Sequence, residues 1–318
     1  MLDFNYRLLR WLSLTVLLCL LSYAESRSQN IVFLTTDSLI YTQRTISGAK
    51  RLIKEQNENA NFHKIFIAAS LEDEKTHVDA IRNLKPTLIF TVGSSATSFA
   101  QKNFTDIPIV FSSVMYPVIS GFVESFTRPG KNITGASLNI QADIQFKYFK
   151  EIIPDLKKIG VLYTNNTRSL IPPAQIIAKS MNLELVAIKI NTEKELPGAL
   201  DSLAKTVDGL WSVADPNLFN PQSTKYILLN SLRKGIPFMG FSRYVVESGA
   251  LFAIDFDYKA IGRQAGEIAN KIIAGTNPTE IGVTCPDVRW FHYNEKTASH
   301  LNIKIPEELA AVAKEVYR

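Results

Sequence analysis

Cysteine is scarce in this chain, and histidine is nearly as scarce. Among 318 residues there are 2 cysteines, Cys19 and Cys285, and 4 histidines. We expect Cys19 to be removed with an N-terminal signal, which leaves one thiol and excludes an internal disulfide. The histidines show neither H-x-x-x-H nor HExxH spacing, so the sequence predicts no metal site. Stability must therefore come from a large packed core.

Clustered charge and catalytic motifs are also missing. The net charge is +5 and the pI about 9.0, but lysines and arginines are scattered, without an arginine-rich stripe interleaved with aromatics. Nucleic acid is therefore not indicated as a partner. There is no G-x-S-x-G elbow, no G-x-x-x-x-G-K-[ST] loop, no G-x-G-x-x-G fingerprint and no marked pair of carboxylates. Together with the features below, these absences favour a binding protein without cofactor or metal over an enzyme.

An apolar run at residues 11–21 (WLSLTVLLCLL) follows a basic start. It is shorter than the about twenty residues that a membrane-spanning helix needs, so an uncleaved anchor is the weaker alternative. Ser22-Tyr23-Ala24 provides a small-x-small cleavage site, so residues 1–24 are predicted to be a cleaved signal peptide. A lipid-modified Cys19 is a further alternative, disfavoured because Leu18 stands where a small residue is required. We expect an exported, periplasmic protein, with membrane tethering less favoured.

Short apolar runs alternate with helix-length amphipathic segments along the rest of the chain. The first series of predicted strands is Ile31–Thr35, Lys64–Ala69, Thr87–Val92 and Ile109–Ser112. The series restarts with Lys158–Tyr163, Leu185–Ile190, Gly209–Val213, Pro237–Gly240 and Leu251–Ile254. Continuous apolar strands followed by helices predict parallel sheets covered on both faces.

The restart predicts an α/β fold of two doubly wound parallel-sheet lobes joined by hinge strands. The expected boundaries are 28–136 plus 252–276 for the first lobe. Residues 137–251 plus 277–318 then form the second lobe and a C-terminal segment. Asn132–Leu138 has small residues that suit a hinge strand. Ligands bind beyond the carboxyl ends of strands in such sheets, so a cleft between the lobes is the expected site.

The strand ends and the loops after them hold the candidate ligand contacts. Gly93-Ser94-Ser95-Ala96 opens a helix, where free N–H groups suit a carboxylate or another small anion; an ordinary serine N-cap is the alternative. Asp215 suits a ligand ammonium or hydroxyl group, with capping of the next turn as its alternative. The candidates are Asp37, Ser38, Gly93, Ser94, Ser95, Tyr116, Ser137, Asn165, Asp215, Phe241, Ser242 and Asp255.

Structural roles compete at several other candidates. Asp37 is a potential helix cap, and one of Asp255 and Asp257 is expected to cap the helix that follows. Tyr116 and Phe241 are suited to stacking on a planar or apolar ligand, although core packing is the usual role of a single aromatic residue.

Several stretches of the chain, taken together, match one known pattern. They are TLIFTVGSSATSFA (87–100), DIPIVFSSVMYPVISGFVESFTRPGKNITGAS (106–137), FKEIIPDLKKIGVLYT (149–164), GIPFMGFSRYVVESGALFAIDFDYKAIGRQAGEIANKIIAGTNP (235–278) and NEKTASHLNIKIPEEL (294–309). This combination resembles the ABC-transporter substrate-binding family that includes tryptophan/tyrosine-type receptors.

The resemblance implies a type I periplasmic-binding-protein fold and an extracytoplasmic receptor, which we expect to be a monomer. Such a receptor delivers a small solute, an amino acid or aromatic compound, to a membrane permease and ATPase. A ligand sensor that presents its bound form to a membrane kinase or receptor is the alternative. Gly93–Ala96 matches the family's Gly-Thr/Ser-x-Ala loop. Tyr116 stands where a V-T-D-P-V segment has aspartate, and the region of Asp215 departs from the commoner P-T-D-N form.

Overall fold

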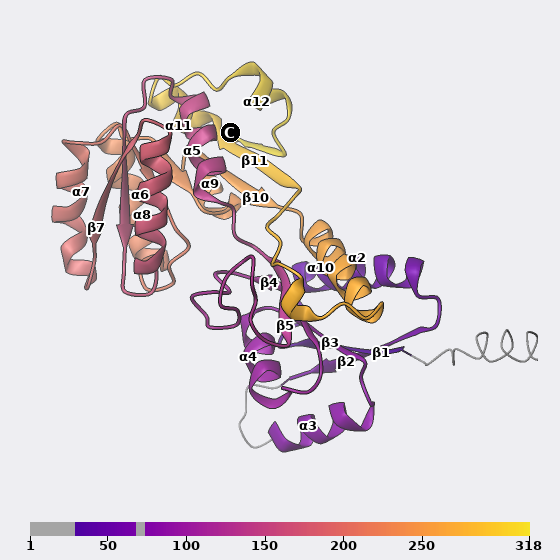
Figure 1. The fold of residues 1–318 in the computed structure, drawn as a ribbon. Coiled ribbons are helices and arrows are strands. Elements are labelled where there is room, and N and C mark those ends of the chain that lie inside the picture. The colour runs from indigo at the N-terminus through magenta and orange to yellow at the C-terminus, as the bar shows by residue number, and fades with distance from the viewer. Residues whose placement is uncertain (1–28, 68–73) are drawn as a thin grey trace, which may run out of the picture.

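The computed structural model describes residues 29–67 and 74–318. The predicted signal peptide lies outside these ranges, as do the last residues of the predicted strand Lys64–Ala69. Among the described residues, no helix combines the length and apolar character needed to cross a membrane. The described chain forms two lobes, each built on its own sheet (Figure 1).

The first lobe, called the five-stranded lobe, has a parallel sheet in the order β2-β1-β3-β4-β5. Its strands are β1 (Gln29–Thr35), β2 (Ala60–Phe66), β3 (Leu88–Val92), β4 (Ile109–Val114) and β5 (Ile133–Ser137). Its helices are α2 (Ile40–Gln56), α3 (Glu74–Asn83), α4 (Ser94–Asn103) and α10 (Tyr258–Ile273).

Alternation along β1 explains why helices cover both faces of this sheet. Ile31 and Phe33 join a core with α2 and α10, while Val32 and Leu34 join a core with α3 and α4. All four side chains are fully buried. The predicted two-sided covering of a mainly parallel sheet is confirmed.

The second lobe, called the seven-stranded lobe, has the strand order β12-β11-β10-β9-β8-β6-β7. Its strands are β6 (Lys158–Tyr163), β7 (Glu184–Lys189), β8 (Gly209–Trp211), β9 (Phe238–Gly240), β10 (Phe252–Phe256), β11 (Arg289–Asn294) and β12 (Glu315–Tyr317). Its helices are α5 (Ala142–Ile152), α6 (Ile171–Ser180), α7 (Leu196–Ala204), α8 (Pro221–Arg233), α9 (Arg243–Glu247), α11 (Glu295–His300) and α12 (Glu307–Ala311). The pair β10–β11 is antiparallel and the other pairs are parallel.

The boundaries between the lobes differ from those predicted. The segment 252–276 was expected in the first lobe, but β10 pairs with β9 and β11 and so belongs to the seven-stranded sheet. Conversely, Thr284 bridges to Ala136, which places the start of the segment 277–318 on the five-stranded lobe. The expected hinge strand is mostly β5, the edge of the five-stranded sheet. The chain therefore passes between the lobes after β5, after β10 and before β11, and short crossings of this kind leave no compositional signal.

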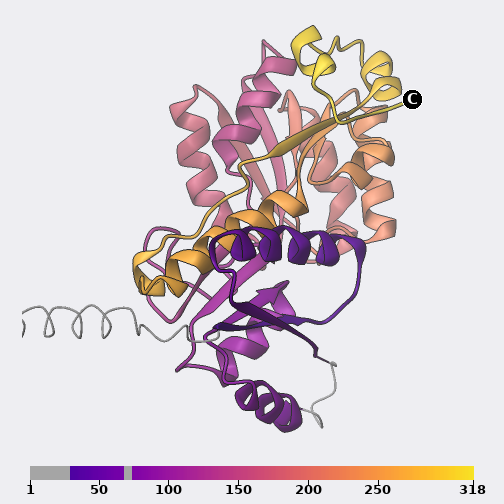
Figure 2. The same ribbon diagram turned by 90° about the vertical axis from the view of Figure 1, so that its right-hand side faces the viewer.

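Helices α2 and α10 pack side by side at close range (Figures 1 and 2). A Cβ atom placed on Gly262 would lie 1.9 Å from the carbonyl oxygen of Thr45, and one on Gly48 would lie 2.1 Å from that of Lys259. Glycine is needed at both positions because the two backbones come too close for any side chain. This contact fastens α10, which returns from the other lobe, to the five-stranded sheet.

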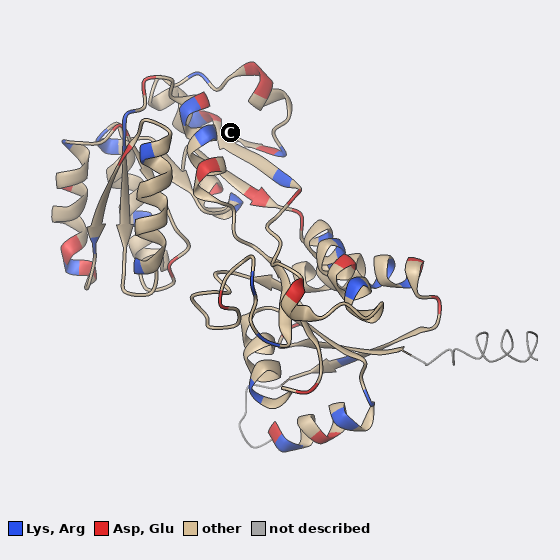
Figure 3. Cartoon of the chain, viewed as in Figure 1, with Lys and Arg blue, Asp and Glu red and all other residues tan. Residues whose placement is uncertain are grey.

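Charged residues of both signs are scattered over the helices of both lobes (Figure 3). Most ion pairs among the described residues join exposed side chains, such as Arg51 with Glu55 and Lys304 with Glu307. Exposed pairs contribute little to stability. Each lobe is therefore stabilised mainly by the apolar cores on the two faces of its sheet.

Candidate functional site

A cavity of about 460 Å³ lies where the lobes meet. The five-stranded lobe contributes Met115, Tyr116 and Phe126, and the crossing segments contribute residues 138–141 and Cys285. The seven-stranded lobe contributes the start of α5, one face of α6 and the carboxyl end of β8. The cavity thus occupies the position expected for a ligand site in two facing doubly wound sheets.

Aromatic and aliphatic side chains form most of the cavity wall. Trp211 lines the cavity from β8, with Phe241 after β9 and Phe256 at the end of β10. The indole of Trp211 is held by its Nε1–H, which donates to Oε1 of Gln145 at 2.8 Å, and by an edge contact with Phe146. A locked, amphipathic ring is a good surface for an apolar or planar ligand.

The charge of the cavity wall is low. The described residues that line it include no lysine, arginine or histidine, and Asp143 in the first turn of α5 is their one acidic member. Cys285 also lines the cavity, and burial raises the pKa of its thiol, so the unreactive protonated form is favoured. The wall suits an apolar ligand better than a strongly anionic one.

Tyr116 crosses the gap between the lobes. Its phenolic oxygen accepts a hydrogen bond from the backbone N–H of Ala214 at 3.1 Å. Its own backbone N–H donates to Oδ1 of Asn139, in the first crossing segment, at 3.0 Å. Burial raises the pKa of Tyr116 to about 12, so the phenol stays protonated and its O–H remains a donor.

Asp215 is buried and fully engaged within the seven-stranded lobe. Its Oδ2 accepts from the backbone N–H and the hydroxyl of Thr164 at 3.1 and 2.8 Å, and from the hydroxyl of Thr167 at 2.6 Å. Its Oδ1 accepts from the backbone N–H of Asn217 at 3.0 Å. The carboxylate therefore joins the loop after β6 to the loop after β8, and it does not line the cavity.

The other acidic candidates and Ser137 also have internal partners. Oδ1 of Asp37 accepts from the backbone N–H of Leu39 and the hydroxyl of Thr42. Oδ2 of Asp255 accepts from the backbone N–H of Arg243 at the start of α9. Asp257 caps α10, so the expected cap between 255 and 257 is at 257. Ser137 donates to the carbonyl oxygen of Val114 and accepts from the N–H of Asn139.

The loop Gly93-Ser94-Ser95 opens α4 as expected, with Gly93 at φ 86° and no side-chain cap. Both serines are exposed, and the loop does not line the cavity. Ser38 and Ser242 stand before α2 and α9 and are also outside it, while Asn165 lines a smaller polar cavity of about 290 Å³. Of the candidate contacts, Tyr116 and Phe241 line the larger cavity; the others stay predictions as ligand contacts.

Sequence reasoning missed much of the cavity wall. Among the residues it did not select are the crossing segment 138–141, the start of α5, Trp211 on β8, and Leu170, Ala174 and Ile177 just before and along α6. The helical residues among them do not lie at strand ends, and apolar residues on a helix are normally core. A helix that begins within a few residues of a chain crossing is the signal that would have directed attention to α5.

Two facing α/β lobes, joined by several crossings around an apolar cavity, define a two-lobed solute-binding protein of the type I periplasmic-binding-protein fold. Residues 30–317 match the family model described as ABC transporter substrate binding protein. The chain belongs to this family. Within residues 29–67 and 74–318, no group of three His, Cys, Asp or Glu side chains is placed to hold a metal ion.

A relative agrees with this assignment, and solved structures share the fold. A tyrosine-binding protein of Clostridioides difficile (strain R20291) is 30% identical over 223 residues, which cover 69% of this chain and 64% of that protein. The ligand-free, open structure of CD0873, a substrate-binding protein with adhesive properties from Clostridium difficile, has a TM-score of 0.75 and 22% identity, covering 91% of this chain and 100% of that one. An ABC domain in complex with L-Trp from Streptococcus pneumonia has a TM-score of 0.64 and 19% identity, covering 91% and 99%. At these identities the two structures show a shared fold.

Proposed function

We propose that this chain is the extracytoplasmic receptor of an ABC-type importer and captures one small metabolite in the interlobe cavity. The observation that carries the proposal is the cavity itself, which is bounded by both lobes and by the segments that join them. Its volume of about 460 Å³ lies in the range typical of small-molecule sites. Closure of the lobes around a ligand would then be a hinge motion about the crossings.

The wall chemistry favours an aromatic compound or an amino acid with a large apolar side chain. Trp211, Phe241 and Tyr116 offer ring surfaces, and the O–H of Tyr116 offers a donor to a ligand oxygen. The named relative binds tyrosine and one similar structure holds L-Trp, which supports a ligand of this size and character.

The same closure would serve a sensor that presents its liganded form to a membrane kinase or receptor. The partners separate the two roles: an importer receptor contacts a permease with its ATPase, and a sensor contacts a kinase or receptor domain. Genes next to the one encoding this chain distinguish them. We place the protein outside the cytoplasm, as a monomer, in either case.

A metabolite screen on protein stripped of copurified ligand tests the proposal. Ligand that binds the native state alone raises the unfolding midpoint, by an amount equivalent to about 2.7 kcal/mol at a concentration 100 times the Kd. We expect aromatic amino acids or related aromatic compounds to raise the midpoint. A broad screen in which no compound shifts it would contradict the proposal.

A further inference from the structure

The hydrogen bond between Tyr116 and Ala214 joins the interiors of the two sheets. Tyr116 comes two residues after β4, and Ala214 comes three residues after β8. Both strands are interior members of their sheets. The bond between the phenolic oxygen and the N–H of Ala214 therefore spans the interlobe gap beside the cavity.

The backbone around Tyr116 is shaped to aim this side chain. Tyr116 has φ 53° and Ser113 has φ 58°, a left-handed conformation that residues with a Cβ adopt only where their surroundings require it. The register of β4 against β5 shifts between Ser112 and Val114. Two hydrogen bonds with the crossing segment 138–141 hold this arrangement. The N–H of Tyr116 donates to Asn139, and the carbonyl oxygen of Val114 accepts from the N–H of Leu138.

The receiving end of the bond is also fixed. Ala214 directly precedes Asp215, whose carboxylate ties the loops after β6 and β8 together through Thr164 and Thr167. The loop that carries the N–H of Ala214 is therefore held in place by Asp215. A bond between two anchored ends constrains the distance between the lobes, whereas a bond to a mobile loop would not.

We propose that Tyr116 is an interlobe latch and the residue that sets ligand specificity in the cavity. Its hydrogen bond holds the lobes of the ligand-free protein at one spacing, and its ring forms the wall against which the ligand packs. The backbone N–H of Ala214 already donates to the phenolic oxygen of Tyr116. A ligand oxygen at this place therefore meets the phenolic O–H instead of the backbone N–H. The specificity part rests on the proposed function; the spacing part is a property of the chain alone.

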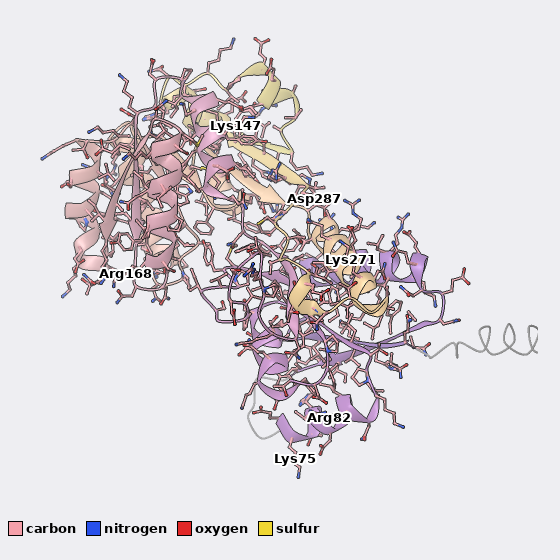
Figure 4. All side chains as sticks on the ribbon, in the orientation of Figure 1. Lys75, Arg82, Lys147, Arg168, Lys271 and Asp287 are labelled. Carbon is pink, nitrogen blue, oxygen red and sulfur yellow. The ribbon has the colours of Figure 1, made fainter. Side chains whose placement is uncertain are left out.

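Single-molecule fluorescence transfer between the lobes tests the spacing part without any ligand. Lys75→Cys on α3 and Arg168→Cys on the seven-stranded lobe carry the dyes, in a Cys285→Ser background (Figure 4). Tyr116→Phe removes the hydroxyl and keeps the ring; we expect a broader and shifted distance distribution. Tyr226→Phe on α8 makes the same chemical change at a residue that does not line the cavity, and it should leave the distribution unchanged. A Tyr116→Phe distribution that matches the unsubstituted Tyr116 chain would overturn the latch.

Titration with a ligand that shifts the unsubstituted protein tests the specificity part. Losing one hydrogen bond and the preorganisation it provides should weaken binding about five- to tenfold in Tyr116→Phe. Tyr116→Leu, which also removes the ring, should weaken binding of an aromatic ligand further. Equal affinity in all three chains would overturn the specificity role. If no compound binds the unsubstituted chain, the proposed function fails, and the distance measurement still decides the latch.

Discussion

Replacing Asp215 by alanine is expected to destabilise the seven-stranded lobe without removing a ligand contact. The side chain is 1% exposed and accepts hydrogen bonds at both carboxylate oxygens. Hydrogen bonds to a charged group contribute about 1.5–3 kcal/mol each, and a donor left unpaired in the interior costs a similar amount. These effects are not additive here, because the N–H of Thr164 also lies 3.3 Å from the hydroxyl oxygen of Thr167 and keeps that partner.

The net loss for Asp215→Ala should therefore be about 3–5 kcal/mol, below the sum of its bonds. For chains of this size that loss corresponds to a fall in the unfolding midpoint of about 10 °C. Thr167→Val is the matched control, since it removes one donor to the same carboxylate and should cost about 1 kcal/mol.

Thermal unfolding followed by circular dichroism, with and without ligand, checks this prediction. We expect Asp215→Ala to melt early and still gain stability from ligand. The opposite pattern, an unchanged midpoint in the free protein with no ligand-dependent shift, would show that the carboxylate contacts the ligand. That result would refute the structural role assigned to Asp215.

Further substitutions test the packing, a helix cap and the acid response. Gly262→Ala places a methyl group against the carbonyl of Thr45 and should lower the free energy of unfolding by about 1–3 kcal/mol. Gly198→Ala, with open space around it in α7, should raise the free energy of unfolding by about 0.5–1 kcal/mol. Urea unfolding compares the two variants, and equal effects would contradict the close contact between α2 and α10. Asn220→Ala removes the capping box of α8 and should cost about 1 kcal/mol in the same assay; no loss would contradict the cap. Burial lowers the pKa of His292, whose ring nitrogens have no hydrogen-bond partner, so the folded chain binds a proton less readily than the unfolded chain. The free energy of unfolding should therefore fall as the pH drops below about 6.5, because the unfolded chain then takes up a proton that the buried ring does not. His292→Leu should flatten that part of the pH–stability curve. An unchanged curve would contradict the lowered pKa of His292.

The fold was largely predictable because the inner strands of the covered sheets are apolar on both faces. Ile31–Thr35 and Lys158–Tyr163 match the strands β1 and β6 in position. The assignment of β10 to a lobe was not predictable, since its apolar pattern fits either sheet and the crossing after it is one residue long. The strand β12 has only partly buried residues, so its pattern is too weak to read.

The site was less predictable than the fold. Tyr116 and Phe241 were selected because they follow strands, and both line the cavity. Asp215 was selected for the same reason, but a carboxylate at a strand end serves equally well to tie neighbouring loops, and local sequence does not separate these roles. Ile177 was missed because an apolar residue on an amphipathic helix is normally core.

The central claim is that a small ligand occupies the cavity between the lobes, and adjacent positions on α6 test it directly. Ile177 lines the cavity, whereas Ile176 is 71% exposed and does not line it. Ile177→Trp should fill the ligand space, and Ile176→Trp adds the same bulk to the outer face of the helix. Calorimetric titration with a ligand that stabilises the unsubstituted protein should show binding to Ile176→Trp with unchanged Kd and a loss of at least tenfold in Ile177→Trp. Equal affinity for both variants would contradict the account and place the ligand elsewhere.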